Sequence, residues 1–224
     1  MEILKFIRNP QEKLSKDKTI YQTLWKVVLL FILCFGSSVI SLLITETLRN
    51  LEFIPEYTRE LGSDVNRIRN NTVFATIVFP IIEELAFRLY LKRNNLNVFI
   101  SSLFMTYMIA SAFVFNTSHF SLEKYGILRI FISLSTALLV LFVYQKRIFS
   151  LNFKWLYYLS ALLFGLVHIY NYDYTNPKVL IFAIIICMPQ ILSGLFFGYA
   201  RIKYGIIGAI ILHGLLNGLP TLIL

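Results

Sequence analysis

The sequence predicts an all-α protein, a polytopic bundle of about seven transmembrane helices. Of its 224 residues, 57% are hydrophobic and only 15% are charged, whereas soluble domains carry about 25% charged residues. The hydrophobic residues form continuous runs of roughly 17 to 25 positions, which is long enough to cross a bilayer as helices. Continuous apolar runs of this length are not soluble strands. The chain suits one compact bundle and leaves little room for a second domain.

Seven runs are expected to cross the membrane. They cover residues 24–48, 72–91, 96–118, 126–144, 155–171, 179–199 and 206–224. Residues 1–23 precede them as a basic cytoplasmic segment or a helix on the membrane surface. Residues 49–71 are the longest polar segment and are interpreted as a short excursion outside the membrane. The expected organisation is therefore an N-terminal segment at 1–23 and one transmembrane bundle at 24–224.

The basic residues predict the orientation of the bundle. If the N-terminus lies inside, the inner segments hold Lys5, Arg8, Lys13, Lys16, Lys18, Lys26, Lys92, Arg93, Lys146, Arg147, Lys154, Arg201 and Lys203. The outer segments hold fewer, namely Arg49, Arg59, Arg67, Arg69, Lys124, Arg129 and Lys178. This imbalance favours a cytoplasmic N-terminus, and the net charge of +9 reflects inner loops rather than nucleic-acid binding. A composition rich in Ile, Lys, Asn and Phe is typical of a low-GC bacterium, so a bacterial cell membrane is expected.

Three ionisable residues lie within the run at 72–91. On insertion scales, each charged side chain near the centre of a membrane helix costs about 2.5–3.5 kcal/mol, so such residues are functional candidates. Glu84 and Arg88 are four residues apart, share a helix face and can pair. Glu83 is about 100° round the helix from Glu84. The two glutamates therefore cannot do the same job: one can face Arg88 while the other faces the bundle interior.

Further polar side chains lie in the fifth and seventh runs. His168 is in the fifth, and His213 and Asn217 are in the seventh. The spacing of His213 and Asn217 places both on one helix face, so both can point at one spot. At 1.5 Å per residue from the inner ends of their runs, Glu83 and His213 reach a similar depth of roughly 10–12 Å, with His168 higher. The side chains of three helices are thus expected to converge.

Three motifs carry a family resemblance. They are E-E-x-x-x-R at 83–88, F-x-x-x-H from Phe164 to His168, and H-x-x-x-N from His213 to Asn217. In this order on three apolar helices, they resemble the CPBP family, which comprises the type II CAAX prenyl endopeptidases and the bacteriocin-processing or immunity (Abi) proteins. The CPBP-like core would cover about residues 72–224. The resemblance implies an intramembrane endopeptidase that hydrolyses a peptide bond of a membrane-associated or lipidated protein, or of a leader peptide.

The resemblance also implies a role for each site residue. Peptide hydrolysis needs an activated water and stabilisation of the tetrahedral oxyanion. Glu83 would be the general base and His168 its partner at the water, while His213 and Asn217 would stabilise the oxyanion. The remaining motif residues would support them: Glu84 and Arg88 as a pair, and Phe164 by packing against the site.

A metal site could use the same residues. Glu83, His168 and His213 offer three ligands and an open position for water, as catalytic zinc requires. The sequence lacks H-E-x-x-H, so the metal-free glutamate mechanism is favoured and no cofactor is expected, with zinc as the alternative.

Two other functional classes remain open. One is a non-catalytic membrane protein that binds a partner in bacteriocin self-immunity, and the other is a proton-coupled transporter. The protease requires that Glu83→Gln abolish cleavage, whereas partner binding would survive this change and a transporter would show proton-coupled flux. In every case the expected partners are the lipid bilayer and a peptide or membrane-protein substrate, with no nucleic acid.

Overall fold

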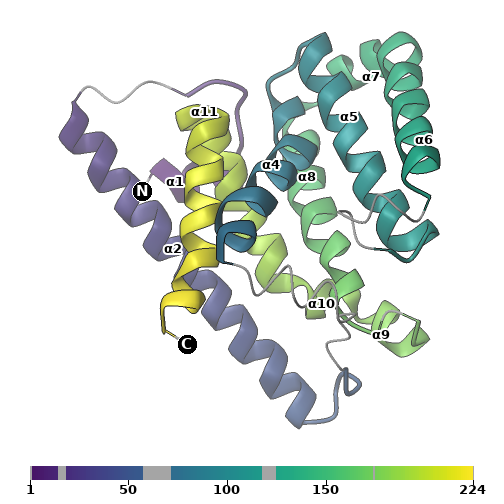
Figure 1. Cartoon of the computed structure of the whole chain (residues 1–224). Coiled ribbons are helices and arrows are strands. Elements are labelled where there is room, and N and C mark those ends of the chain that lie inside the picture. The colour runs from purple at the N-terminus through teal and green to yellow at the C-terminus, as the bar shows by residue number, and fades with distance from the viewer. Residues whose placement is uncertain (1, 15–18, 58–71, 118–124, 174, 224) are drawn as a thin grey trace.

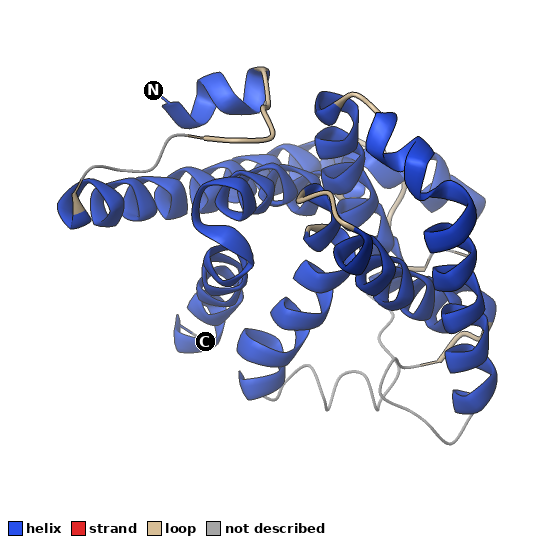
Figure 2. Cartoon of the chain, turned by 90° about the horizontal axis from the view of Figure 1, so that it is seen from above, coloured by secondary structure: helices blue, strands red, loops and turns tan. Residues whose placement is uncertain are grey.

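All regular elements in the described part of the chain are helices (Figure 2). The structure is a computed structural model that describes residues 2–14, 19–57, 72–117, 125–173 and 175–223. The elements in chain order are α1 (Glu2–Arg8), α2 (Ile20–Asn50), η1 (Phe74–Val78), α4 (Phe79–Phe87), η2 (Leu89–Leu91), α5 (Asn95–Ile109), η3 (Ala110–Val114), α6 (Gly126–Leu139), η4 (Val140–Tyr144), α7 (Gln145–Ser150), α8 (Phe153–Val167), η5 (His168–Asn171), α9 (Pro177–Ile181), α10 (Ala183–Ile186) and α11 (Met188–Ile223). Of the predicted polar excursion, residues 58–71 lie outside the described residues.

Five helical stretches of the described chain are long and apolar enough to cross a membrane. They are Ile20–Asn50, Asn95–Val114, Gly126–Ser150, Phe153–Asn171 and Met188–Leu219. The polytopic all-α fold is therefore confirmed, and the difference from seven spans arises at two places. The predicted run at 72–91 is divided into η1, α4 and η2. The run at 179–199 is broken into α9 and α10, and α11 starts beside Pro189, a residue without a backbone N–H that suits the first turn of a helix.

The longest helix, α11, is a hairpin that contains the last part of the sixth predicted run and nearly all of the seventh. Gly205 has φ 81° and ψ −177°, which is far from helical and is a region that essentially glycine alone adopts. The rings of Phe197 and His213 stack with centroids 4.4 Å apart across this bend, whereas a straight helix would separate sixteen residues by about 24 Å. In Figure 1 the two halves of α11 run in opposite directions, from α10 up to the bend and down to the C-terminus. The bend brings His213 back onto the bundle.

α2 packs against α11 through small and polar side chains. Cys34 is buried, and Ser38 Oγ lies 2.8 Å from Ser193 Oγ of α11. Thr45, also buried, extends the contact to the neighbouring α10, where its Oγ1 donates to Ile185 O at 3.2 Å. In lipid, association between helices depends on close packing and interhelical hydrogen bonds, because lipid tails are as apolar as leucine. The other faces of α2 expose large apolar side chains, as a helix at the lipid boundary does.

The N-terminal helix α1 is docked on the bundle. Ile3 and Phe6 are buried in its main core. Glu2 forms ion pairs with Lys26 at 2.5 Å and with Lys203 at 2.8 Å, and so links α1 to α2 and to the bend of α11. Burial raises the pKa of Glu2, but the hydrogen bonds and charges of the two lysines outweigh it and hold the pKa below the ordinary value.

Two arginines that the orientation prediction counts with the inner and outer segments are buried in helices. Arg129 lies in α6, where it donates to Ser111 Oγ at 3.0 Å and sits 5.2 Å from the ring centre of Tyr107. Arg201 lies in α11 with 7% of its surface exposed. Polar groups of neighbouring helices accept hydrogen bonds from each buried guanidinium. Neither arginine therefore indicates on which side of the membrane a loop lies.

Candidate active site

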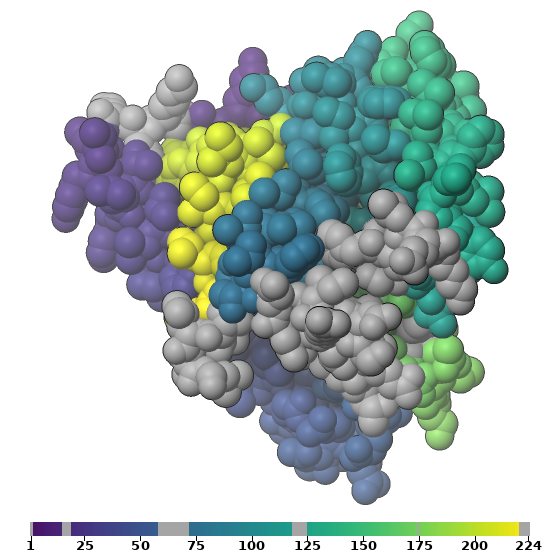
Figure 3. Space-filling model, in the orientation of Figure 1, coloured from purple at the N-terminus to yellow at the C-terminus, as the bar shows by residue number. Residues whose placement is uncertain are grey.

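The glutamates lie on a short helical segment in the middle of the bundle. η1 is a π-helix, α4 follows it, and the chain leaves helical geometry at Arg88, where φ is −122°. Figure 3 shows this segment (blue) beside the C-terminal half of α11 (yellow). Backbone that departs from regular helix at membrane depth is tolerated where protein groups surround it.

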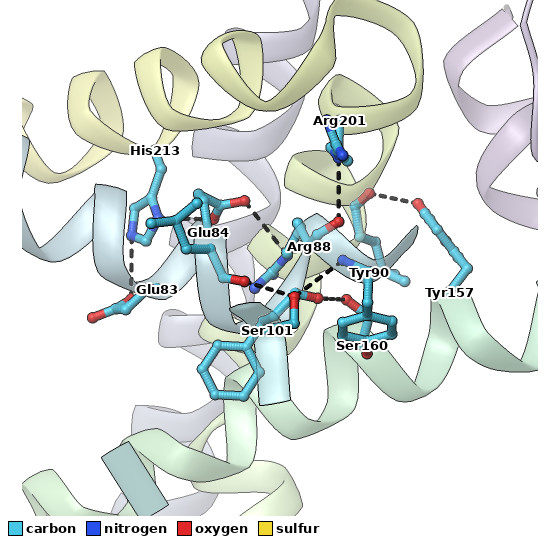
Figure 4. A network of polar contacts seen from close by, with 12 residues as sticks. Glu83, Glu84, Arg88, Tyr90, Ser101, Tyr157, Ser160, Arg201 and His213 are labelled. Carbon is cyan, nitrogen blue, oxygen red and sulfur yellow. Dashed lines mark hydrogen bonds and ion pairs between the residues drawn. The ribbon is translucent and has the colours of Figure 1, made fainter. Parts of the chain in front are cut away.

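Side chains from three other helices bind the carbonyls at the end of the glutamate segment (Figure 4). Ser101 of α5 donates to Leu85 O at 2.8 Å, and Ser160 of α8 donates to Phe87 O at 2.5 Å. Arg201 donates to the carbonyls of Arg88 at 3.3 Å and of the next residue at 3.1 Å. The last carbonyls of a helix lack intrahelical donors, and the two serines supply them at the end of α4. The two carbonyls that Arg201 binds lie beyond α4 and also accept the backbone N–H groups of Leu91 and Lys92. Sequence reasoning missed all three donors, since a serine or arginine among apolar residues gives no sign of which carbonyl it will reach.

Glu84 connects two other motif residues. Its Oε1 lies 3.0 Å from His213 Nδ1, and its Oε2 lies 3.7 Å from Arg88 Nε. The side chains of Glu84 and Arg88 are completely buried and that of His213 is 4% exposed. The pairing of Glu84 with Arg88 that their spacing predicts is thus present, and His213 of α11 contacts Glu84 as well. These opposite charges lower the cost of burying one another.

Glu83 faces the two histidines. Its Oε2 lies 3.6 Å from His213 Nε2 and 3.9 Å from His168 Nε2. Its side chain is 15% exposed, and Oε2, itself buried, has no hydrogen-bond partner within the described part of the chain. His168 Nδ1 is 2.7 Å from Phe164 O; because a carbonyl only accepts, Nδ1 carries the proton, and Nε2 presents its lone pair towards Glu83 in the neutral ring. Glu83 is therefore the glutamate whose side chain is partly exposed and whose carboxylate faces both histidines.

Phe164 is the aromatic centre of the site. Its ring contacts those of His168 and His213 edge-on, with centroids 4.9 and 5.5 Å apart. The guanidinium carbon of Arg88 lies 3.9 Å from its ring centre, which is cation–π geometry. Three of the polar side chains are thus held in place by one apolar residue.

Asn217 does not share its target with His213. Its Nδ2 donates to Ala75 O in η1 at 3.1 Å, whereas His213 faces the glutamates. The two residues do share a helix face, as expected, but they do not point at one spot, because their partners lie on different turns of the opposing segment.

The described residues contain no group of three or more His, Cys, Asp or Glu side chains arranged to hold a metal ion. Glu83, His168 and His213 lie together: Nε2 of His213 is 3.6 Å and Nε2 of His168 is 3.9 Å from Glu83 Oε2. Both histidine rings are also held through their other nitrogen: Nδ1 of His213 is bonded to Glu84, and Nδ1 of His168 is bonded to a backbone carbonyl.

Comparison with known proteins identifies one family. Residues 138–219 match the model of the family described as type II CAAX prenyl endopeptidase Rce1-like. The match includes the motifs of His168 and His213, and the glutamate motif lies before it. No curated protein and no solved structure matches the chain. The CPBP resemblance that the three motifs predict is confirmed.

Proposed function

From its membership of the CPBP intramembrane proteases, we propose that this chain hydrolyses a peptide bond by a water that Glu83 activates. The family match supports a CAAX-type intramembrane endopeptidase in general. The proposed mechanism rests on the different surroundings of the two glutamates. Glu84 is completely buried and engaged by His213 and Arg88, whereas Glu83 is partly exposed between His168 and His213.

The attacking water would lie between Glu83 and the histidines. Polar atoms 3.6–3.9 Å apart are too far for a direct hydrogen bond, but one water can bridge them. Such a water donates one hydrogen to Glu83 Oε2 and the other to the lone pair of His168 Nε2, which leaves its own lone pair for attack. Glu83 takes the proton as the oxygen bonds to the carbonyl carbon, and then gives it to the departing amine.

His213 would stabilise the oxyanion. With Nδ1 held by Glu84, a doubly protonated His213 donates from Nε2 on the side that faces Glu83. A donor fixed in a dry site stabilises charge that develops there more strongly than one in water. Glu84 and Arg88 would act by holding this ring.

The protein is an integral membrane protein. As part of the proposal, its N-terminus is cytoplasmic in a bacterial membrane, and its substrate is a membrane-associated or lipidated protein or a leader peptide. The basic Lys26 and Lys203 lie at one end of the bundle, both bonded to Glu2, which agrees with that end facing the cytoplasm.

The test is cleavage of a peptide library by protein purified in detergent, with and without chelator, alongside metal analysis. We expect Glu83→Gln to abolish cleavage while Glu46→Gln, the same change outside the site, keeps it. Persistence of cleavage without metal supports the glutamate mechanism. Near-stoichiometric zinc together with loss of cleavage in chelator would instead make Glu83, His168 and His213 ligands. Unchanged cleavage by Glu83→Gln would reject the proposal.

A further inference from the structure

Pro80 deprives one carbonyl of the π-helical segment of its backbone donors. The carbonyl of Ala75 would be bonded in an α-helix by the N–H of Phe79, but that N–H instead reaches Phe74 O. In the π register the donor would be residue 80, which is proline and has no N–H. A carbonyl in a membrane bundle without a donor costs several kcal/mol.

Asn217 supplies a donor to this carbonyl. Its Nδ2 lies 3.1 Å from Ala75 O, across the contact between η1 and the C-terminal half of α11. The side chain is partly buried. A polar side chain of a neighbouring helix is one of the groups that satisfy backbone freed by proline in membrane helices.

The glycines around Asn217 show that the approach is close. A Cβ at Gly214 would lie 2.4 Å from Thr76 O, and one at Gly218 would lie 3.2 Å from Thr76 Cγ2. A Cβ at position 214 would collide with the η1 backbone, and one at position 218 would crowd the Thr76 side chain, so the two glycines permit the close approach of α11 to the carbonyls of η1. The contact is separate from the bond between His213 and Glu84, one turn away on the same helix.

The geometry points to Asn217 as a positioning residue: its amide replaces the backbone donor that Pro80 removes, and with His213 it fixes the register of the glutamate segment against α11. Two bonds at different heights restrain both sliding and rotation of the segment, and the direction of Glu83 depends on both. This inference rests on the proposed function where it concerns catalysis. It differs from the expected oxyanion role, in which the amide would touch the reacting atoms.

The experiment compares Asn217→Leu with the double variant Pro80→Ala/Asn217→Leu. Alanine at position 80 restores an N–H that can bond the carbonyls of η1, so it should compensate for the missing amide. Pro189→Ala with Asn217→Leu is the matched control, since it restores an N–H in a different helix. Amide hydrogen exchange of residues 74–82 in detergent is measured for each, together with kcat and KM for a cleaved peptide.

For Asn217→Leu we expect faster exchange in residues 74–82 and a kcat lower by roughly up to 100-fold, the loss that small misplacements of a catalytic group cause. We expect Pro80→Ala, but not Pro189→Ala, to restore both towards wild type. A loss of kcat with unchanged exchange and no rescue would overturn the inference and return Asn217 to the oxyanion. Unchanged exchange and activity would also overturn it.

The exchange measurement needs no substrate, so it tests the positioning role even if Glu83→Gln disproves the proposed function. If Asn217→Leu alone does not fold, as judged by size-exclusion chromatography, the inference still requires the double variant with Pro80→Ala to fold. Failure of that double variant to fold would overturn it.

Discussion

Replacing Gly165 by alanine tests how tightly α8 is packed against α11. A Cβ at this position would lie 2.1 Å from Ile191 Cγ1, 2.8 Å from Ile191 N and 2.9 Å from Ile191 Cα. The side-chain atom can rotate away, but the two backbone atoms cannot. Ordinary carbon contacts need about 3.5–4.0 Å, so the two helices must separate by a few tenths of an ångström or more. Overpacking of this kind typically costs 1–3 kcal/mol.

The assay is thermal unfolding of the purified protein in detergent, with Gly36→Ala as the matched control. Among the residues that the structure describes, no atom lies within 4 Å of a Cβ at Gly36. Alanine favours a helix interior by up to about 1 kcal/mol over glycine. We expect Gly165→Ala to lower Tm by roughly 2–10 °C and Gly36→Ala to leave it unchanged or slightly higher. Equal Tm values for the two variants would refute the close packing of α8 on α11. Because Phe164 and His168 flank this contact, cleavage should fall with Gly165→Ala as well.

Three further outcomes are expected. Gly205→Ala should destabilise the hairpin by about 1–3 kcal/mol, since φ 81° with ψ −177° is strained for alanine, and an unchanged Tm would contradict the bend. Glu84→Gln should reduce kcat and lower stability by about 3–5 kcal/mol, because Arg88 loses its buried counter-charge; a fall in KM alone would contradict that role. The folded pKa of Glu2 is below its ordinary 4.5, so its stabilising effect is present above that pH and is lost as pH falls through the folded pKa. Limited proteolysis of α1 should therefore accelerate on acidification in the wild type, and an equal acceleration in Glu2→Gln would exclude Glu2 as the cause.

The sequence predicted the elements that depend on local pattern. Continuous apolar runs predicted the all-α bundle. The spacing of Glu84 and Arg88 predicted their pairing, because four residues make about one helical turn. The three motifs gave the family. Which atoms meet across helices could not be predicted, since this depends on crossing geometry: the partner of His213 is Glu84, while Asn217 reaches η1.

Prolines mark both places where a predicted span is broken, but a proline does not by itself predict how the helix will change. Pro80 and Pro189 are visible in the sequence, but proline in a membrane helix can kink it, break it or start it. Near Pro80 the helix continues through a π-helical segment, whereas α11 begins beside Pro189. The outcome is decided by whether neighbouring helices supply the missing donors, which a single run of residues does not reveal.

The glutamate segment is held at both of its ends by side chains. Asn217 bonds a carbonyl before Pro80, and Ser101, Ser160 and Arg201 bond the carbonyls where α4 ends. Backbone groups within a membrane bundle have little water to bond, so the serine donors satisfy the end of α4, and Arg201 adds to the backbone bonds that the next two carbonyls already accept. The same bonds reduce the freedom of Glu83, which a general base must lose to remain within reach of its water. Stability and the proposed catalysis thus both require this segment to be held in place, and variants of these donors should affect both together.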